Sequence, residues 1–216
     1  MISKLDVSMG VPIALDVDGI FTNFDAHWRQ CAERELGRPL PQVSHDHSMR
    51  ERYALTRAEY DAVWAAYHAD EWHRLPLYTY AADLVYALED LGCTVWAVTS
   101  IDVRHRAARA ESLVGLIPAG RIVCVGHAAP ASAKANVLRD LGAVAFLDDH
   151  PANANAAINV VSLPVLLDRG YHGLEAPAYG VTVIDDALDF PVLVESLLKR
   201  TGLAAGRLAD DKVMAA

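Results

Sequence analysis

The chain has 216 residues and a formal net charge of −9, with 53% hydrophobic and 22% charged residues. This length is enough for one α/β domain with a substantial core and a small insertion. So acidic a chain is a poor candidate for holding duplex nucleic acid, because binding to the phosphate backbone requires a basic surface. A small phosphorylated substrate is compatible with the charge, since a metal ion and one or two placed cations can capture it.

Cysteines and apolar segments indicate the cellular setting. Cys31, Cys93 and Cys124 show no paired spacing, and the last two lie at or inside apolar runs. We therefore expect buried thiols rather than a disulfide framework, as is usual in a reducing compartment. Residues 1–10 lack the long apolar core of a signal peptide, and no apolar run approaches the length of a membrane span. These features predict a soluble cytoplasmic protein that does not bind membranes.

Short apolar runs alternate with amphipathic stretches along most of the chain. We expect strands at residues 11–17, 93–99, 121–126, 143–149, 160–168 and 181–185. Runs rich in Val, Ile and Leu without strict alternation are typical of strands that are covered on both faces. Pro164 indicates an edge position or a break in the fifth strand, because proline cannot donate a backbone hydrogen bond.

Helical patterns separate these runs. They cover residues 80–91, 103–113, 132–141, 153–159 and 190–199, and Gly92 is a natural stop for the first of them. Strands that alternate with helices imply a mostly parallel sheet with right-handed crossovers. The predicted fold class is therefore α/β, with a doubly wound core.

Residues 20–75 interrupt this alternation. They hold two helical patterns, at 24–36 and 56–69, joined by a polar loop that contains His45-Asp46-His47. A connection this long inside a compact domain is usually functional. We interpret it as a small helical cap inserted after the first strand, with the core formed by residues 1–19 and 76–200. Residues 201–216 are expected to be a loose tail.

Polar side chains follow four of the predicted strands. In an open parallel sheet, ligands bind at the carboxyl ends of the strands, so these residues are expected to meet at one edge. A chance distribution of polar residues would rarely place carboxylates, hydroxyls and an ammonium group there together. The candidates are Asp16, Asp18, Gly19, Thr99, Ser100, Lys134, Asp148 and Asp149.

This set of side chains suggests a phosphoryl-transfer reaction. Clustered carboxylates repel one another and need a cation, and hard oxygen ligands suit Mg²⁺. The metal and Lys134 can together neutralise a phosphate, and Thr99 can donate a hydrogen bond to it. One carboxylate can attack phosphorus to form an acyl phosphate, while a second protonates the leaving oxygen and later activates water. Gly19 allows a sharp turn beside the site.

The ordered series Asp16-x-Asp18-Gly19, Thr99, Lys134 and Asp148-Asp149 resembles the four motifs of the haloacid dehalogenase (HAD) superfamily, over about residues 11–151. The resemblance implies that Asp16 is the nucleophile and Asp18 the acid/base. It implies phosphate binding by Thr99 and Lys134, and a cap after the first strand. The implied metal ligands are Asp16, Asp18 through its backbone carbonyl, Asp148 and Asp149.

Details of the first motif narrow the resemblance. Asp18 argues against a true dehalogenase, which lacks this second aspartate, and Ile20-Phe21 replaces the Lys-Thr pattern of ion-pumping ATPases. Among the activities of this superfamily, the resemblance then implies a magnesium-dependent phosphomonoesterase with an aspartyl-phosphate intermediate. The string DVDGIFTNF, which ends at Phe24, is also similar to the 5'(3')-deoxyribonucleotidases, in which Phe24 would contact the nucleoside and Ser100 would assist at the phosphate. Ile101 departs from that group, which usually has proline there.

Simpler interpretations compete at each motif. An isolated DxDG is more often a turn or a helix cap, and here it lacks the further ligands of a calcium loop. Thr99-Ser100 and Asp148-Asp149 could cap the helices that follow them, and a lone Lys134 is most often a surface lysine. The four motifs in order favour catalysis. The rival functions are another phosphotransfer enzyme for a small metabolite and a non-enzymatic relative that binds phosphate or metal.

The remaining candidates are secondary. Arg104, Arg106 and Arg109 are interpreted as a solvated helix face, with a phosphate contact by Arg104 as the alternative. The cap aromatics are expected to be mostly cap core, with one lining the pocket; they are Trp28, Trp64, Tyr67 and Trp72. We interpret His45-Asp46-His47 as a polar loop rather than a metal site. His127 is expected near the edge of the site, and His150, which follows the acidic pair, is expected behind the metal ligands.

Overall fold

The computed structural model describes residues 10–203 of the chain. Its centre is a six-stranded sheet with the strand order β3-β2-β1-β4-β5-β6, and every neighbouring pair is parallel. The strands are β1 Val11–Leu15, β2 Cys93–Thr99, β3 Ile122–Cys124, β4 Ala145–Asp148, β5 Leu163–Leu167 and β6 Thr182–Ile184. The predicted doubly wound α/β core is confirmed, with β1 between β2 and β4.

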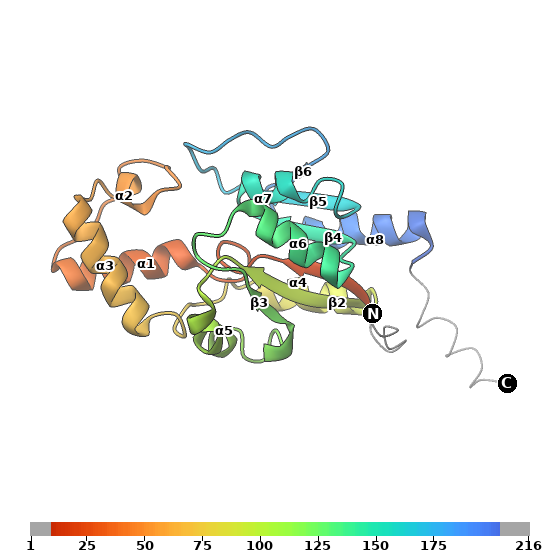
Figure 1. Cartoon of the computed structure of the whole chain (residues 1–216), viewed down its shortest axis with the longest axis horizontal. Coiled ribbons are helices and arrows are strands. Elements are labelled where there is room, and N and C mark those ends of the chain that lie inside the picture. Colours follow the sequence, from red (N-terminus) through yellow and green to blue (C-terminus); the bar gives the residue numbers. More distant parts are fainter. Residues whose placement is uncertain (1–9, 204–216) are drawn as a thin grey trace.

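Helices cover both faces of this sheet (Figure 1). The core helices are α4 Ala81–Asp90, α5 Arg106–Ser112, α6 Ala131–Leu141, α7 Pro151–Ala156 and α8 Asp189–Thr201. Side chains of α4 and α8 belong to one buried cluster, whereas Leu138 of α6 belongs to another. Ile13 and Leu15 of β1 face the first cluster and Ala14 faces the second, as expected for the two-residue period of a strand.

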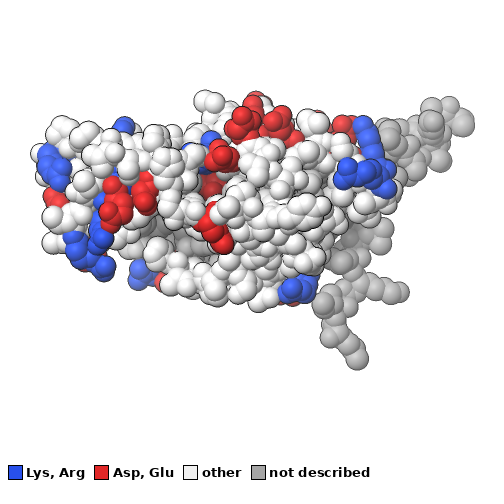
Figure 2. Space-filling model, turned by 90° about the horizontal axis from the view of Figure 1, so that it is seen from above, with Lys and Arg blue, Asp and Glu red and all other residues white. Residues whose placement is uncertain are grey.

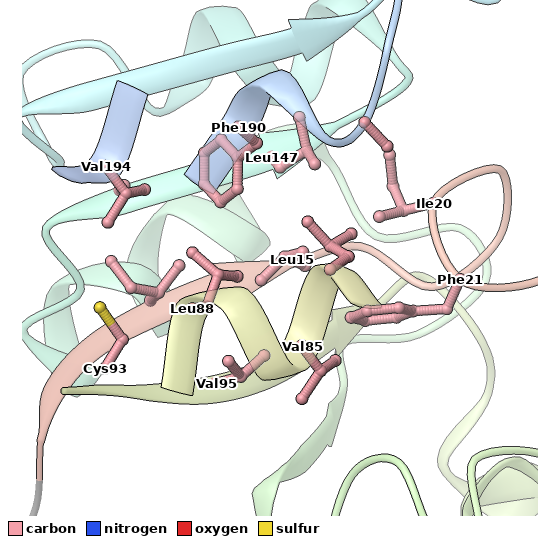
Figure 3. Close-up of a cluster of buried hydrophobic side chains, with 14 of the residues drawn as sticks. Leu15, Ile20, Phe21, Val85, Leu88, Cys93, Val95, Leu147, Phe190 and Val194 are labelled. Carbon is pink, nitrogen blue, oxygen red and sulfur yellow. The ribbon is translucent and has the colours of Figure 1, made fainter. Parts of the chain in front are cut away.

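Figure 3 shows how the larger cluster is built. Strand residues Leu15, Val95 and Leu147 pack against α4 and α8, which lie next to each other on the same face of the sheet. The helical partners labelled there are Val85, Leu88, Phe190 and Val194. Burial of a Leu, Phe or Val side chain contributes about 1.5–3 kcal/mol, so this cluster is a main source of the stability of the core. It also holds the end of β1 in place, immediately before Asp16.

The cap contains three helices beyond the carboxyl ends of the strands (Figure 1): α1 Phe24–Leu36, α2 Met49–Arg52 and α3 Arg57–Asp70. Asn23 caps α1 by accepting from the Ala26 amide, and Thr56 and Glu59 form a reciprocal capping box on α3. The cap has its own buried cluster, separate from the clusters of the sheet. This cluster also includes Ile101, which follows β2, and Ala108 of α5 and Cys124 of β3 pack against it, so the cap helices also pack on the core.

Several expected elements differ from the structure. The short helix α2 falls within the predicted polar loop, and residues 103–113 divide into the 3₁₀ turn η1 Val103–His105 and helix α5. The prediction of an edge strand or a break at Pro164 is wrong, since β5 lies between β4 and β6. Pairing of β5 with β6 begins only at Val165, so Pro164 has a strand partner on the β4 side alone.

The cysteines and the apolar segments can also be compared with expectation. Cys31 and Cys93 are buried free thiols, but Cys124 is only half-buried, because it lies in the edge strand β3. None of the helices within residues 10–203 combines the length and the apolar character needed to span a membrane. Most of the predicted tail at 201–216 lies outside the described residues; α8 ends at Thr201.

Candidate active site

Three carboxylates meet at the carboxyl edge of the sheet. Asp16 follows β1 and Asp148 ends β4, and these two strands pair through Leu15 and Leu147. The Asp16 amide donates to the Leu147 carbonyl at 2.9 Å, which brings the two strand ends together. One oxygen atom each from Asp16, Asp148 and Asp149 lies within 4.8 Å of the others. Within the described residues, this is the one group of three such side chains that could hold a metal ion.

Lys134 of α6 lies against these carboxylates. Its Nζ is 2.9 Å from Asp16 Oδ1 and 2.7 Å from Asp148 Oδ2. The side chain is 1% exposed, so the alternative of a surface lysine is wrong. Burial opposes the charged form, but the Asp148 and Asp16 carboxylates outweigh it and raise the pKa of Lys134 above its ordinary value. The lysine is therefore held as an ammonium ion.

The three carboxylates carry more negative charge than Lys134 can neutralise. Burial raises the pKa of Asp16 to about 7, with Lys134 opposing the shift and Asp148 adding to it. Burial and the charge of Asp148 also raise the pKa of Asp149 well above its ordinary value. Carboxylates that retain protons near neutral pH are ready to exchange them for a cation. The donor set, all oxygen and all acidic, fits Mg²⁺.

Asp148 and Asp149 have different surroundings. Asp148 Oδ1 accepts hydrogen bonds from the His150 amide at 2.8 Å and from Asn153 Nδ2 at 3.1 Å, while its Oδ2 faces Lys134. Asp149 instead lines the cavity together with Asp16. Both oxygens of Asp148 are thus already engaged, which leaves Asp149 as the better placed of the two for a direct metal contact.

Gly19 is required by this arrangement. Its φ of +80° lies in the left-handed region, and a Cβ atom there would come within 1.9 Å of Asp149 Oδ2. Arg169, which follows β5, donates from Nε to the Gly19 carbonyl at 2.9 Å. The turn after β1 is therefore packed against an acidic residue on one side and fixed by an arginine on the other.

Asp18 forms an ion pair with Arg109 that we did not predict. Arg109 Nη2 lies 2.8 Å from Asp18 Oδ1 and 2.7 Å from Oδ2, and the Thr22 hydroxyl donates to Oδ1 at 2.9 Å. Arg109 is 0% exposed, so its interpretation as part of a solvated face is wrong. Arg104 is exposed, as expected, and it does not line the cavity. Arg106 donates to the carbonyls of Ala119 and Ile122.

Thr99 and Ser100 lie at the carboxyl end of β2, beside β1, and both line the cavity. The Thr99 hydroxyl is buried and has no partner within the described residues, so it is free to bind a ligand oxygen. Neither residue caps the next helix, because Asp102 caps η1 by accepting from the Arg104 amide. His150 likewise caps α7, so the cap interpretation is also wrong for Asp148-Asp149.

A cavity of about 560 Å³ joins these residues to the cap. Phe24, Trp64 and Trp72 line it, whereas Trp28 and Tyr67 are buried within the cap. The Phe24 ring stacks on Trp72 at 6.1 Å between centroids and on Trp64 at the same distance. We expected one of the four cap aromatics to line the pocket, and two of them, Trp64 and Trp72, do so. The remaining lining residues include Asp25, His47, Arg52, Tyr60, Tyr78, His127, His150 and Tyr171.

The histidine loop connects the cap with the core. The His47 amide donates to the His172 carbonyl at 3.1 Å, and the His172 amide donates to the His45 carbonyl at 2.8 Å. These two hydrogen bonds tie the loop to the segment that follows β5. Figure 2 shows acidic side chains around the junction of cap and core on the face that it displays.

Two residues near the motifs were missed by sequence reasoning. Arg169 gave no signal, because the loop after the fifth strand carries no recognisable pattern. Arg109 did give one: it stands four residues before Leu113, which is also fully buried, so both occupy the apolar face of the segment. A charged residue on an apolar helix face indicates a buried ion pair.

Similarity to known proteins is found in the structure of the chain and not in its sequence. No family model and no curated protein matches the sequence. A haloacid dehalogenase-like family hydrolase from Xanthomonas campestris has a TM-score of 0.59 at 15% identity, covering 90% of this chain and 99% of its own. CbbY from Rhodobacter sphaeroides, in complex with phosphate, has a TM-score of 0.57 at 16% identity, covering 84% and 96%. A HAD family hydrolase from Deinococcus radiodurans, with bound phosphate and sodium, has a TM-score of 0.55 at 13% identity, covering 93% and 99%.

Proposed function

The chain has the haloacid dehalogenase-like fold, and we propose that it is a magnesium-dependent phosphomonoester hydrolase that works through an aspartyl phosphate. One observation carries the proposal. At the carboxyl edge of the sheet, a buried lysine lies between Asp16 and Asp148, while the Thr99 hydroxyl beside them has no hydrogen-bond partner among residues 10–203. Such a place supplies a nucleophile, a cation and a hydrogen-bond donor for one phosphate group.

Asp16 is the nucleophile in this proposal. Its carboxylate attacks phosphorus, the bond from phosphorus to the ester oxygen breaks, and Asp18 gives its proton to the departing oxygen. Asp18 then takes a proton from water, which attacks phosphorus and breaks the bond to Asp16. Lys134, Thr99 and Ser100 hold the phosphate oxygens during both steps. Asp16, Asp149 and the Asp18 carbonyl would hold Mg²⁺, with Asp148 behind them, and the ion would supply positive charge for the phosphate.

We propose a (deoxy)nucleoside monophosphate as the substrate. Phe24, Trp64 and Trp72 present aromatic rings to the same cavity that holds Asp16, and stacking of a base on such rings contributes about 1–3 kcal/mol. The cavity volume of about 560 Å³ lies within the usual range for small-molecule sites. The acidic surface is compatible with this substrate, because a metal ion at the carboxylates would provide local positive charge beside the Lys134 ammonium group.

Arg52 and Asp25 favour a second candidate, a sugar phosphate or a similar polar ester. Arg52 Nη1 lies 2.8 Å from Asp25 Oδ1, and both side chains line the cavity from the cap. An ion pair that faces a ligand can donate to and accept from hydroxyl groups. The aromatic rings outnumber this pair, so the nucleotide is the first choice.

The test is phosphate release from a panel of esters, with Mg²⁺ and with EDTA. The panel contains nucleoside and deoxynucleoside monophosphates, sugar phosphates and p-nitrophenyl phosphate. We expect turnover that requires Mg²⁺ and favours the nucleotides. Asp16→Asn should abolish it while the fold survives, and Asp140→Asn, on the exposed side of α6, is the matched control. Turnover of sugar phosphates alone would reject the nucleotide, and binding of Mg²⁺ and phosphate without any turnover would reject the enzyme.

A further inference from the structure

Arg109 is buried at a place where burial is costly. Its side chain is 0% exposed, and two of its nitrogen atoms, Nε and Nη1, are buried without a partner within the described residues. Taking a guanidinium group out of water costs several kcal/mol unless close pairing compensates. Its charge partner is Asp18, which Nη2 contacts through both carboxylate oxygens. The arginine is therefore committed to this one carboxylate.

The contacts of Asp18 fix its orientation. Oδ1 accepts from Arg109 and from the Thr22 hydroxyl, whereas Oδ2 accepts only from Arg109 within the part of the chain that the structure describes. The carboxylate also lines the cavity, and its side chain is 24% exposed. Oδ2 is thus the oxygen with free capacity to exchange a proton with a ligand. Without Arg109, the Thr22 bond alone would leave the carboxylate free to rotate about its long axis.

Arg109 itself is held from the cap side. Its guanidinium lies over the Trp72 ring, 5.2 Å from the centroid, which is within the range of a cation–π contact. Trp72 lines the cavity and stacks on Phe24. One arginine of the core therefore contacts both Asp18 and an aromatic ring of the cap that lines the cavity.

We infer that Arg109 is a positioning residue for proton transfer: it holds Asp18 Oδ2 toward the ester oxygen, and Trp72 of the cap holds Arg109. The inference rests on the proposed function. In the first step the proton moves from Asp18 Oδ2 to the ester oxygen as the bond between that oxygen and phosphorus breaks. Arg109 keeps all its protons and touches neither substrate nor phosphate.

The test compares two leaving groups. A nucleoside monophosphate loses an alkoxide that must be protonated, whereas p-nitrophenyl phosphate loses a stable phenolate that needs no acid. kcat/KM reports the steps up to departure of the leaving group. In Arg109→Met we expect kcat/KM to fall about a hundredfold for the nucleotide and less than about tenfold for p-nitrophenyl phosphate. Arg106→Met, on the same helix, should leave both values unchanged.

Two further variants distinguish positioning of Asp18 by Arg109 from a purely structural role of Arg109. Arg109→Lys keeps the charge and should recover part of the loss on the nucleotide. In an Asp18→Asn background, adding Arg109→Met should change the residual kcat/KM for p-nitrophenyl phosphate by less than about twofold, because Arg109 acts through Asp18. If the Arg109→Met single variant does not fold, the comparison is made with Arg109→Lys and with the Asp18→Asn, Arg109→Met double variant.

The outcomes are distinct. An equal loss on both esters, or a large further loss in the Asp18→Asn background, would overturn the inference and assign Arg109 to structural support. A wild-type protein that releases no phosphate from either ester would instead overturn the proposed function, and the inference with it. Selective loss on the nucleotide with partial recovery by lysine supports both.

Discussion

Lys134 Nζ lies 2.9 Å from Asp16 Oδ1, and both side chains are buried at the carboxyl edge of the sheet. The same ammonium group contacts Asp148 at 2.7 Å, so one cation holds the ends of β1 and β4 together. It compensates only part of the charge of the three carboxylates. The uncompensated negative charge is what a bound cation would neutralise.

Lys134→Met tests this balance. The substitution leaves the neighbouring carboxylates buried without their cation, which should lower the free energy of unfolding by about 3–5 kcal/mol in metal-free buffer. Mg²⁺ should restore part of the loss, because it supplies positive charge at the same place. Urea unfolding with and without Mg²⁺ measures both effects. Lys199→Met, at an exposed ion pair with Glu195, should change stability by less than about 1 kcal/mol. Equal losses in the two variants would contradict the assigned role of Lys134.

Metal binding should depend on pH. Burial raises the pKa of Asp16 from 3.8 to about 7 in the metal-free protein, so the folded state retains a proton that the unfolded chain has released. The resulting stabilisation is fully present below about pH 3.8 and is lost as the pH rises through about 7. Mg²⁺ should bind the ionised carboxylates and restore the stability that is lost when Asp16 releases its proton. We therefore expect Mg²⁺ to raise the melting temperature more at pH 8 than at pH 6.

Thermal unfolding at several pH values, with and without Mg²⁺, provides the measurement. Asp16→Asn is the comparison variant, because it removes the titrating group and should flatten the pH dependence. Asp149, whose pKa burial also raises, should preserve a smaller dependence in that variant. An increase in melting temperature that is the same at pH 6 and pH 8 would show that these carboxylates do not bind the ion.

The aromatic side of the cavity can be tested through substrate affinity. Phe24→Leu keeps an apolar side chain but removes the ring that stacks on Trp64 and Trp72. Loss of one stacking contact of about 1–3 kcal/mol should raise KM for nucleoside monophosphates about tenfold, with kcat little changed. Steady-state kinetics with glycerol phosphate, which has nothing to stack, provides the control substrate. A matching rise in KM for both esters would argue against base stacking.

Those features of the fold that depend on local pattern could be predicted. The run at residues 93–99 matches β2 because an uninterrupted apolar run is what burial on both faces requires. The end of α1 at Leu36 was predicted equally well, since Gly37 follows in a left-handed conformation. Burial of Lys134 could not be read from its helix alone, because its partners lie in two other segments of the chain.

Contacts between distant segments account for what was missed. Arg109 and Asp18 are separated by 91 positions, and Arg169 and Gly19 by 150, so no local pattern links them. Helix α2 has only four residues, too few for an apolar period to be visible. The neighbours of each catalytic candidate therefore emerged only from the packing, even though the candidates themselves follow the predicted strand ends.

Gly19→Ala should disable the site through a steric effect. A Cβ atom at position 19 would lie 1.9 Å from Asp149 Oδ2, so the carboxylate must move away from Asp16. Gly37→Ala is a matched control: its φ of +63° also favours glycine, but a Cβ atom there meets nothing within 4 Å. Both variants should lose about 1 kcal/mol of stability from the backbone conformation. Only Gly19→Ala should lose Mg²⁺ binding, measured by calorimetry, and magnesium-dependent turnover. Similar Mg²⁺ affinity in the two variants would remove Asp149 from the proposed metal site.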